Sequence, residues 1–510
     1  MEIILNAMTA QKNEIIATQQ QKISHLEHTL QIIACENNWL REQLKLNKST
    51  LYAPSTETSH AFNMALFDAT TADEVMVTEE KNAVGEVTHT GHRPGSTPKK
   101  GRQIDTAKLP RERRVHDLTP EEKICSCGCE LEKIGEDVSE QLEHIPAVIK
   151  VIEHVQIKYA CRQCETISAG KKPEQPMAKC LASTSLITEV IIKKYDYHIP
   201  LYRQSLILAQ EGIDIPDNTL GNWVMGAAQG LSPLHQAFWE QVEKVRLLQV
   251  DETPVKILEP DKKGYMWAYH SVDKGNRFIV FEFDLSRGSA VVNERLKNFK
   301  GILQTDAYSG YTFQRARSDI VAVGCWDHAR RKFTDAIKVA NNNKSGLAGK
   351  AVHLMAKFYK IEKDYKQASV EERYRARQQY TKPLLTELYE LMDQANAPPE
   401  SLLGKAIVYL QNNKPYLIKY VEYGDVAISN CLVENQIRPF AVGRRNWLFV
   451  GNEVSANKSA LLYSLIQTAK MNNIHPGKYL NYVLSQVHAV RRGDVDPVSL
   501  LPQFINKNLL

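Results

Sequence analysis

The sequence has no long apolar run, so it offers no candidate for a membrane-spanning helix. Its first residues lack a basic start and a sustained apolar core, and we therefore expect no secretory signal peptide. Only 9 cysteines occur in 510 residues, which is too few for a disulfide scaffold. A formal net charge of only +5 gives little support by itself for nucleic-acid binding. At 43% hydrophobic and 24% charged residues, the composition is that of a globular protein of about three domains.

Five of the cysteines fall within residues 125–164, which indicates metal binding in a reducing compartment. Two close groups about thirty residues apart can converge on one tetrahedral Zn²⁺. We therefore predict a small β-rich zinc module over residues 116–180, with a structural role because four thiolates leave no open position. Only four of the five can be ligands. Cys161 and Cys164 form one pair, Cys127 is a third ligand, and Cys125 and Cys129 are alternatives for the fourth.

The first 49 residues predict a leucine-rich helix, and two interpretations of this helix stay open. A heptad seam predicts a coiled coil, with Asn37 at a position where a buried asparagine fixes register. Alternatively, the helix packs on its own chain. The seam comprises Ile16, Gln19, Ile23, Leu26, Leu30, Ile33, Asn37, Leu40 and Leu44.

Residues 50–115 resemble a flexible linker, because Ser, Thr, Pro and Gly occur there without a sustained period. The linker has an acidic half followed by a basic half. The basic half could lie along DNA phosphates, or could be a solvated tail.

Residues 181–244 predict a helical region, with helices over 186–195, 201–210 and 218–224. Gly212 lies in the turn before the last helix, and Asp217 is expected to cap that helix. A helix, a short glycine-containing turn and a second capped helix are typical of helix-turn-helix DNA-binding domains. Many helical hairpins share this pattern without binding DNA, so both interpretations stay open.

From residue 245 the pattern changes to strands. The order of elements matches that of a ribonuclease H-like mixed sheet. It comprises three strands, a helix capped by Ser289, a strand, a helical connection and a strand. In that fold the first and fourth strands are neighbours, which would bring Asp251 beside Asp306. The expected strands cover residues 245–258, 264–272, 277–284, 301–306 and 320–325; the expected helices cover 289–299 and 328–333.

The chain therefore predicts a multidomain α+β and α/β protein whose catalytic core has two parts. The first part covers residues 245–333, a helical insertion covers 334–425, and the last part covers 426–455. That last part begins with a short amphipathic helix that carries Glu434 and that Pro439 is expected to stop. A C-terminal helical region over 456–510 contains helices at 459–471 and 476–489.

Asp251, Asp306 and Glu434 form a candidate acidic site. Carboxylates in apolar surroundings need a partner, and two Mg²⁺ (or Mn²⁺) ions with oxygen ligands would satisfy three of them. Such a pair of ions supports cleavage and transfer of a phosphodiester. Alternatively, Asp251 lies past the strand end and caps a turn at Thr253. Strand alternation points Glu252 to the opposite face, which excludes it from the site.

Basic residues near this site suit a polyphosphate substrate; the alternative for some of them is a solvated face. They are Lys256, Arg330, Arg331, Arg438, Arg444 and Arg445.

These motifs resemble the transposases of the insertion-sequence-66 family, in the DDE transposase group. The chain reads Val-Asp-Glu-Thr-Pro-Val from residue 250, Thr-Asp-Ala-Tyr-Ser-Gly-Tyr from residue 305 and His-Ala-Arg-Arg-Lys-Phe from residue 328. Other matching blocks cover residues 40–46, 125–164, 200–204, 437–439, 443–449 and 463–470. The chain departs from the family at residues 49–57, in its compressed first cysteine group, and at Asp327, where a small residue is more usual.

The resemblance implies that Asp251, Asp306 and Glu434 are the catalytic acids of a two-metal transposase. It also implies double-stranded DNA partners (element ends and target), a homo-oligomer, possible accessory proteins of the same element, and a bacterial cytoplasmic, nucleoid-associated location. A different class of function is a catalytically inactive DNA-binding regulator or domesticated copy. A third is a ribonuclease H-like nuclease without strand transfer. Metal-dependent nicking of end DNA, and the joining of the products to target DNA, would separate these hypotheses.

Overall fold

The computed structural model describes residues 149–160, 167–170, 174–177, 180–258, 263–306, 308–340 and 345–510, with scattered positions between 16 and 44. The chain divides into two compact units, one made of Met1–Val77 with Pro173–Leu510 and the other of Thr78–Lys172. The linker and all five cysteines of the predicted zinc module lie outside the described residues, so these remain predictions.

The unit Thr78–Lys172 contains one described pair of strands. Strand β1 (Lys158–Ala160) pairs antiparallel with β2 (Ile167–Ala169). The Gln156 side-chain amide donates to the carbonyl of Gly170 at 2.8 Å, which closes the base of this hairpin. A β-rich module was predicted over residues 116–180, and this hairpin lies within that range.

The described positions between 16 and 44 are helical, which confirms the predicted helix at those positions. Their apolar side chains are exposed, from 48% for Ile16 to 65% for Leu30. Pairing of this helix as a coiled coil stays a prediction.

Four helices precede the sheet: α4 (Thr184–Tyr195), α5 (Leu201–Gln210), α6 (Asp217–Gly230) and α7 (Ser232–Val242). The predicted helices are therefore present. Asp217 is the first residue of α6, and Pro216 is its N-cap, so the expected cap by Asp217 is wrong. Gly212 adopts φ +84° in the turn between α5 and α6, a conformation that favours glycine.

The sheet has five strands in the order β5-β4-β3-β6-β7. Antiparallel pairing joins β3, β4 and β5, whereas β6 and β7 run parallel to β3. The first and fourth strands of the sheet are thus adjacent, as predicted. The strands are β3 (Leu247–Lys256), β4 (Lys263–Ser271), β5 (Phe278–Asp284), β6 (Gly301–Gln304) and β7 (Ile320–Val323).

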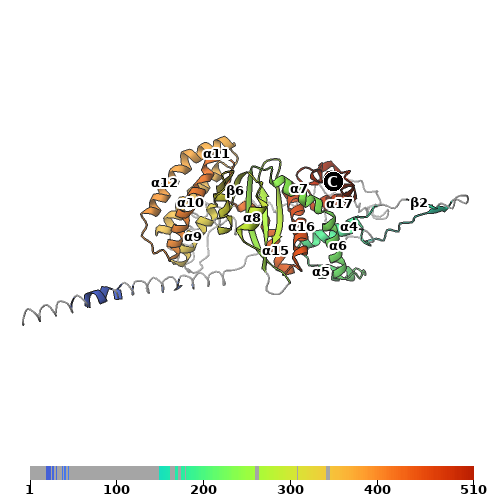
Figure 1. Cartoon of the computed structure of the whole chain (residues 1–510), viewed down its shortest axis with the longest axis horizontal. Coiled ribbons are helices and arrows are strands. Elements are labelled where there is room, and N and C mark those ends of the chain that lie inside the picture. The colour runs from blue at the N-terminus through green and yellow to red at the C-terminus, as the bar shows by residue number, and fades with distance from the viewer. Residues whose placement is uncertain are drawn as a thin grey trace, which may run out of the picture. The chain divides into compact units, whose positions relative to one another are not determined.

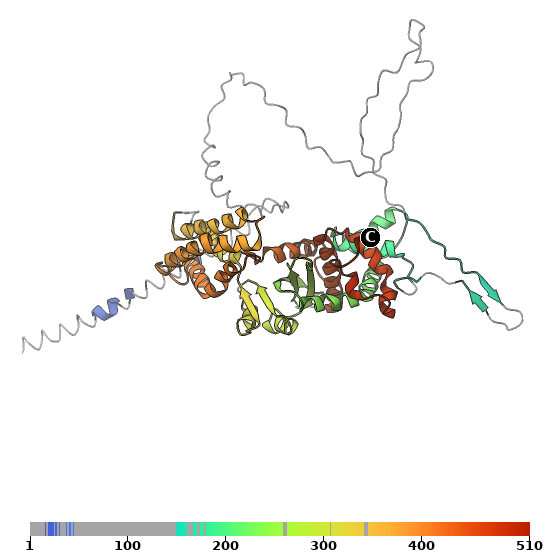
Figure 2. The same cartoon turned by 90° about the horizontal axis from the view of Figure 1, so that it is seen from above.

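Two helical layers lie on either side of this sheet within the same unit, as Figures 1 and 2 show. One contains α4–α7 with the long helix α16 (Glu453–Met471), and the other contains α9 (Trp326–Val339) with the helices of the insertion. Between β5 and β6 lies the short helix α8 (Ser289–Arg295), and η2 (Ser309–Arg315) follows β6. Gly288 is the N-cap of α8, which ends at Arg295, so the predicted cap by Ser289 and the extension to residue 299 are wrong.

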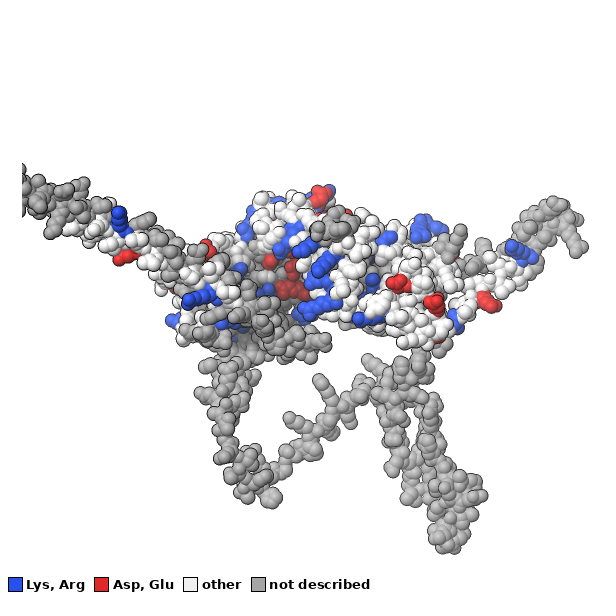
Figure 3. Space-filling model, turned by 90° about the horizontal axis from the view of Figure 1, so that it is seen from below, with Lys and Arg blue, Asp and Glu red and all other residues white. Residues whose placement is uncertain are grey.

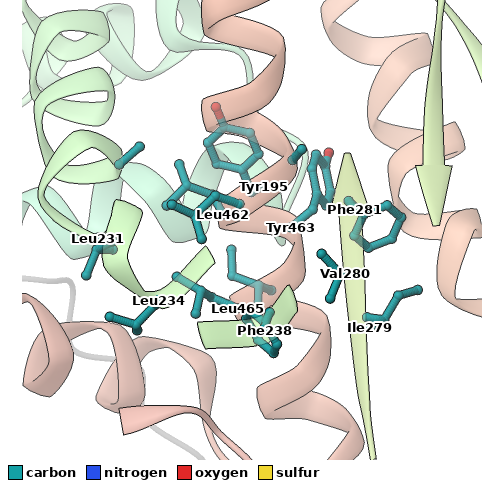
Figure 4. Close-up of a cluster of buried hydrophobic side chains, with 14 of the residues drawn as sticks. Tyr195, Leu231, Leu234, Phe238, Ile279, Val280, Phe281, Leu462, Tyr463 and Leu465 are labelled. Atoms are coloured by element: carbon teal, nitrogen blue, oxygen red, sulfur yellow. The ribbon is translucent and has the colours of Figure 1, made fainter. Parts of the chain in front are cut away.

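Helix α16 packs along the outer strand β5 and carries one of the two hydrophobic cores (Figure 4). Tyr463 makes edge-on contacts with the rings of Tyr195, Phe281 and Phe440. Polar groups of α16 also bond the strand, because Ser464 Oγ accepts from the Phe281 amide at 2.8 Å and Thr468 Oγ1 accepts from the Ile279 amide at 3.1 Å. This helix thereby joins the C-terminal region to the sheet.

The described part of the insertion is mostly helical, as predicted, and builds the second core against β6, β7 and α9. Arg377 is only 2% exposed and donates hydrogen bonds to Glu362 and to the carbonyl of Tyr420. These bonds join the middle of the insertion to its last part. Its elements are α10 (Leu347–Asp364), α11 (Val370–Ala376), η3 (Arg377–Thr381), α12 (Lys382–Asp393), α13 (Leu402–Asn412), α14 (Lys414–Leu417) and η4 (Ile418–Glu422).

Helix α15 (Cys431–Trp447) runs through Pro439, so the prediction that Pro439 stops this helix is wrong. Proline removes a backbone donor, but tertiary packing outweighs that local effect here. Val433, Ile437 and Phe440 are buried on one face of α15, on both sides of the proline. The helix ends instead at Trp447, and its C-cap Leu448 has a φ of +64°.

After α16, the chain ends in α17 (Pro476–Ser485), α18 (Val487–Arg492), η5 (Pro497–Leu500) and η6 (Lys507–Leu509). The predicted helix over 476–489 is thus two helices. Among the described residues, none of the helices has the length and apolar character needed to cross a membrane.

Candidate active site

The structure brings Asp251, Asp306 and Glu434 together from three segments. Asp251 lies within β3, Asp306 follows β6 by two residues, and Glu434 lies in the first turn of α15. Parallel pairing of β3 with β6 ends at Gln249 opposite Gln304, and the same register continued by two residues sets Asp251 opposite Asp306. We call these three residues the acidic triad.

Asp251 is not a turn residue. Strand β3 continues past it to Lys256, and Thr253 still pairs with Met266 of β4. The alternative in which Asp251 caps a turn at Thr253 is therefore wrong.

Two buried glutamines fix the segments that carry the triad. The side-chain amide of Gln249 donates to the side-chain oxygen of Gln304 at 2.8 Å and to the Ser429 carbonyl at 3.2 Å. Its own side-chain oxygen accepts from the amide of Val433 at 3.2 Å, one residue before Glu434. Gln304 donates to the Ala427 carbonyl at 2.7 Å. Both glutamines are fully buried, so these bonds hold β3, β6 and the start of α15 in one arrangement.

Burial and mutual repulsion shape the electrostatics of the triad. Burial raises the pKa of Asp251 well above its ordinary value, and the nearby charges of Glu252, Glu434 and Asp306 raise it further. Burial also raises the pKa of Asp306 and of Glu434. Asp251 accepts from the backbone amide of Glu252 at 2.9 Å, and Asp306 accepts from that of Tyr308 at 3.0 Å. No Lys or Arg among the described residues forms an ion pair with Asp251 or Asp306, although cations lie nearby.

Glu252 makes its side-chain contacts with residues outside the triad, on the face of β3 that strand alternation sets opposite Asp251. Its side chain, 2% exposed, pairs with Arg287 at 2.6 Å and accepts from the Tyr311 hydroxyl at 2.5 Å. The Arg287 guanidinium in turn stacks on the ring of Tyr308, 3.8 Å from its centroid. The charge of Arg287 also lowers the pKa of Asp306, against the effect of burial. Arg287 is therefore a cation near the site, and it was not among the basic residues predicted from the sequence.

His328 and Cys325 lie beside Glu434. His328 Nδ1 is 3.9 Å from Glu434 Oε1, and burial lowers the pKa of His328 to about 4, so this histidine is neutral near pH 7. One ligand atom from each of Cys325, His328 and Glu434 lies within 4.8 Å of the other two. Sequence reasoning missed this group, because about a hundred residues of insertion separate Glu434 from His328.

Asp327, where the sequence departs from the family, is buried rather than exposed. Its carboxylate accepts a hydrogen bond from the hydroxyl of Tyr359 on α10. The charge of Asp327 also raises the pKa of Glu434. Asp327 thus links helix α10 of the insertion to the region around Glu434.

The predicted basic residues divide into two groups. Lys256, Arg331 and Arg445 are exposed, whereas Arg330, Arg438 and Arg444 are half-buried. Arg444 donates to Thr253 Oγ1 at 3.0 Å and to the Pro254 carbonyl, so it fastens α15 to β3. The charges of Arg331 and Arg438 lower the pKa of Glu434, and that of Lys332, also missed, lowers the pKa of Asp306. On the face in Figure 3, acidic side chains gather in a hollow with Lys and Arg along its border.

The residues of the triad fit a divalent cation. Three half-buried carboxyl groups would supply hard oxygen ligands, which Mg²⁺ and Mn²⁺ prefer. Their raised pKa values show that the site disfavours their negative charge, and a cation would offset that cost.

Comparison with known proteins decides the family. A model described as the IS66 transposase family matches residues 179–458, and the zinc-finger binding domain of transposase IS66 matches residues 122–165. The chain belongs to the IS66 transposase family. Its resemblance to that family, seen first in the sequence, is therefore confirmed. The matched regions of this IS66-family chain contain the whole triad and all five cysteines of the predicted zinc module.

Relatives of this IS66-family chain occur in Sinorhizobium fredii (strain NBRC 101917 / NGR234). The uncharacterized protein y4jD is 32% identical over 72% of this chain and 76% of its own length. The uncharacterized protein y4hP is 31% identical over 72% of this chain and 71% of its own length. The family indicates transposition chemistry with a divalent metal, and its zinc-finger domain indicates zinc.

Proposed function

We propose that this chain is a transposase that binds the terminal inverted repeats of its own element and catalyses metal-dependent DNA cleavage and strand transfer. The observation that carries the proposal is the convergence of Asp251, Asp306 and Glu434 from β3, β6 and α15. Burial disfavours the charge of all three, which is unfavourable for stability unless a cation binds.

In this mechanism the triad holds two Mg²⁺ or Mn²⁺ ions. Ions bound there supply activation of a water or 3′-hydroxyl and stabilisation of the leaving oxygen of a phosphodiester. Asp251, whose pKa the charges of Glu434 and Asp306 both raise, would hold the ions together with those two acids. The Gln249–Gln304 pair holds the strands in register, and Arg444 anchors α15 to β3, so that Glu434 keeps its position.

We assign the core to the ribonuclease H-like fold. The order β5-β4-β3-β6-β7, with three antiparallel strands followed by two parallel ones, supports this assignment. We further assign the exposed Lys256, Arg331 and Arg445 to DNA phosphates near the site, because charge at exposed positions is available to a polyanion. The helices α5 and α6, the zinc module and the basic half of the linker are proposed to bind element ends in the bacterial cytoplasm.

Self-association is part of the proposal, because two element ends must be joined by one complex. The exposed apolar positions between 16 and 44 support pairing of the N-terminal helix with a second copy. Removal of residues 1–49 is expected to lower the oligomeric state in solution without loss of the folded core.

The test uses the full chain, a DNA that carries the element's ends, and a target DNA. Wild-type protein with Mg²⁺ or Mn²⁺ should nick the end DNA and yield joined products. Asp251→Asn, Asp306→Asn and Glu434→Gln should each abolish both reactions, whereas Asp364→Asn, an exposed control at the end of α10, should not.

Three outcomes would contradict the proposal in different ways. Full activity of Asp251→Asn would overturn the assignment of the triad. Binding of end DNA by wild-type protein without any nicking would favour a DNA-binding regulator or domesticated copy. Nicking without joined products, with target DNA present, would favour a nuclease.

A further inference from the structure

Cys325, His328 and Glu434 form a second ligand set, in which only Glu434 also belongs to the acidic triad. Cys325 precedes α9, His328 lies in its first turn, and Glu434 lies in the first turn of α15. Their ligand atoms are all within 4.8 Å of one another, and His328 Nδ1 is 3.9 Å from Glu434 Oε1. In tetrahedral zinc sites, ligand atoms bound at ordinary distances are roughly 3.3–3.6 Å apart, so a small movement of side chains would close this site.

The chemistry of this set differs from that of the triad. Sulfur and imidazole nitrogen are ligands for Zn²⁺, Co²⁺ and similar ions, whereas Mg²⁺ takes oxygen. Three protein ligands leave a fourth position open, as in zinc sites that exchange water. Moreover, His328 Nδ1 is buried and has no hydrogen-bond partner in the described part of the chain. A bound ion would satisfy this nitrogen, whose isolation is otherwise unfavourable.

The two segments that carry these ligands are held together before any ion binds. The Trp326 amide donates to the Ile428 carbonyl at 3.2 Å, which joins the start of α9 to the segment before α15. The bond from the Val433 amide to Gln249 fixes the first turn of α15 against β3. Cys325 is 1% exposed, but the side chains of His328 and Glu434 are 23% and 27% exposed, so an ion can approach from their side.

We propose that Cys325, His328 and Glu434 bind a thiophilic divalent ion such as Zn²⁺ at a site that shares Glu434 with the acidic triad. Binding there withdraws Glu434 from the Mg²⁺ site, so that the thiophilic ion inhibits the reaction. The inhibition rests on the proposed function, whereas the binding does not.

Cobalt absorption tests the binding by itself. The full chain with its zinc module loaded with Zn²⁺ is titrated with Co²⁺, and thiolate-to-cobalt absorption in the near ultraviolet is recorded. Wild type and Cys180→Ser, a control at another described free cysteine, should bind one Co²⁺ more than Cys325→Ser. His328→Ala should bind this ion less tightly by roughly tenfold or more. Equal binding and equal absorption in Cys325→Ser and wild type would overturn the proposal.

Folding of the variant must be established, because Cys325 is buried. Thermal unfolding in EDTA compares Cys325→Ser with wild type, and Cys325→Ala replaces it if the serine variant unfolds early. Either variant keeps the cysteines of the zinc module, so the difference from wild type isolates the site at α9.

Inhibition is measured on end-DNA cleavage at constant Mg²⁺ with increasing Zn²⁺. Cys325→Ser should cleave as wild type does with Mg²⁺ alone, and should need roughly tenfold or more Zn²⁺ for half inhibition. If neither protein cleaves DNA, the proposed function fails while the cobalt result still decides the metal site. If both cleave and Zn²⁺ inhibits them equally, the shared site is wrong and the proposed function stands.

Discussion

The side chain of Gln249 donates a hydrogen bond to the side chain of Gln304 at 2.8 Å, in the interior of the protein. Each glutamine lies two residues before an aspartate of the triad, and Gln249 and Asp251 lie on the same face of β3. Because Gln249 also bonds both Ser429 and Val433, this one pair links all three segments that supply an acid.

Gln249→Leu is expected to weaken metal binding as well as stability. The change leaves the Gln304 oxygen, the Ser429 carbonyl and the Val433 amide without this partner, at about 1–3 kcal/mol for each buried group left unsatisfied. We expect a lower unfolding free energy in denaturant and a higher Mg²⁺ requirement for cleavage. Gln210→Leu, at an exposed position ending α5, is the control. If Gln249→Leu is destabilised but its Mg²⁺ requirement is unchanged, Gln249 contributes to stability and not to metal binding.

Asp251→Asn should stabilise the protein when divalent ions are removed, although it abolishes activity. The pKa of Asp251 is raised in the folded state, so its stabilising contribution exists below the ordinary pKa and is lost as pH rises through the raised one. At about pH 8 in EDTA, asparagine should therefore raise the unfolding free energy, because it removes a charge that the folded state disfavours. Adding Mg²⁺ should raise the Tm of wild type more than that of the variant. A variant less stable than wild type in EDTA would show that repulsion within the triad is unimportant.

Arg377→Met should destabilise the insertion strongly. The change leaves Glu362 without its buried partner and frees the Tyr420 carbonyl, and breaking such buried pairs costs roughly 3–5 kcal/mol. Arg375→Met, two residues away, is the matched control, because Arg375 is 74% exposed in its pair with Glu371. We expect this control to change stability by about 0.5 kcal/mol or less. Urea unfolding of both variants measures the difference, and equal effects would contradict the structural role of Arg377.

Glu282 should make stability depend on pH. Burial in β5 raises its pKa from 4.5 to about 7, although Arg295 pairs with it and opposes the shift. A raised folded-state pKa stabilises the protein fully below pH 4.5, and this contribution is lost as pH rises toward 7. Relative to Glu282→Gln, wild type should therefore lose on the order of 3 kcal/mol between about pH 4.5 and pH 7. Parallel Tm profiles of the two proteins over this range would contradict the shift.

The two aspartates could be predicted from the sequence because strand periodicity is local. Asp251 interrupts an apolar strand and Asp306 follows another, and the strand order then makes them neighbours. The glutamines carried a similar signal, since each is a polar residue in an apolar strand, two residues before its acid. That signal was overlooked because glutamine has no characteristic chemistry at such sites.

Other features depend on packing that no local pattern reveals. The proline rule predicted an end to α15 at Pro439, but burial of Ile437 and Phe440 on both sides keeps the helix intact. His328 meets Glu434 only because the insertion returns the chain to the start of α9, where Trp326 bonds Ile428. Contacts between residues so far apart in the sequence come from the tertiary fold alone.

The bonds from α16 to β5 determine how the sheet can meet other chains. Asn457 completes the series on alternate residues, as its Oδ1 accepts from the Phe283 amide at 3.3 Å, after Ser464 at Phe281 and Thr468 at Ile279. An edge strand normally offers these amides to any extended peptide, and thereby invites sheet-to-sheet aggregation. Here side chains of a helix occupy the outward amides of β5. If copies of this protein associate, as proposed, they are therefore expected to do so without adding strands to that edge.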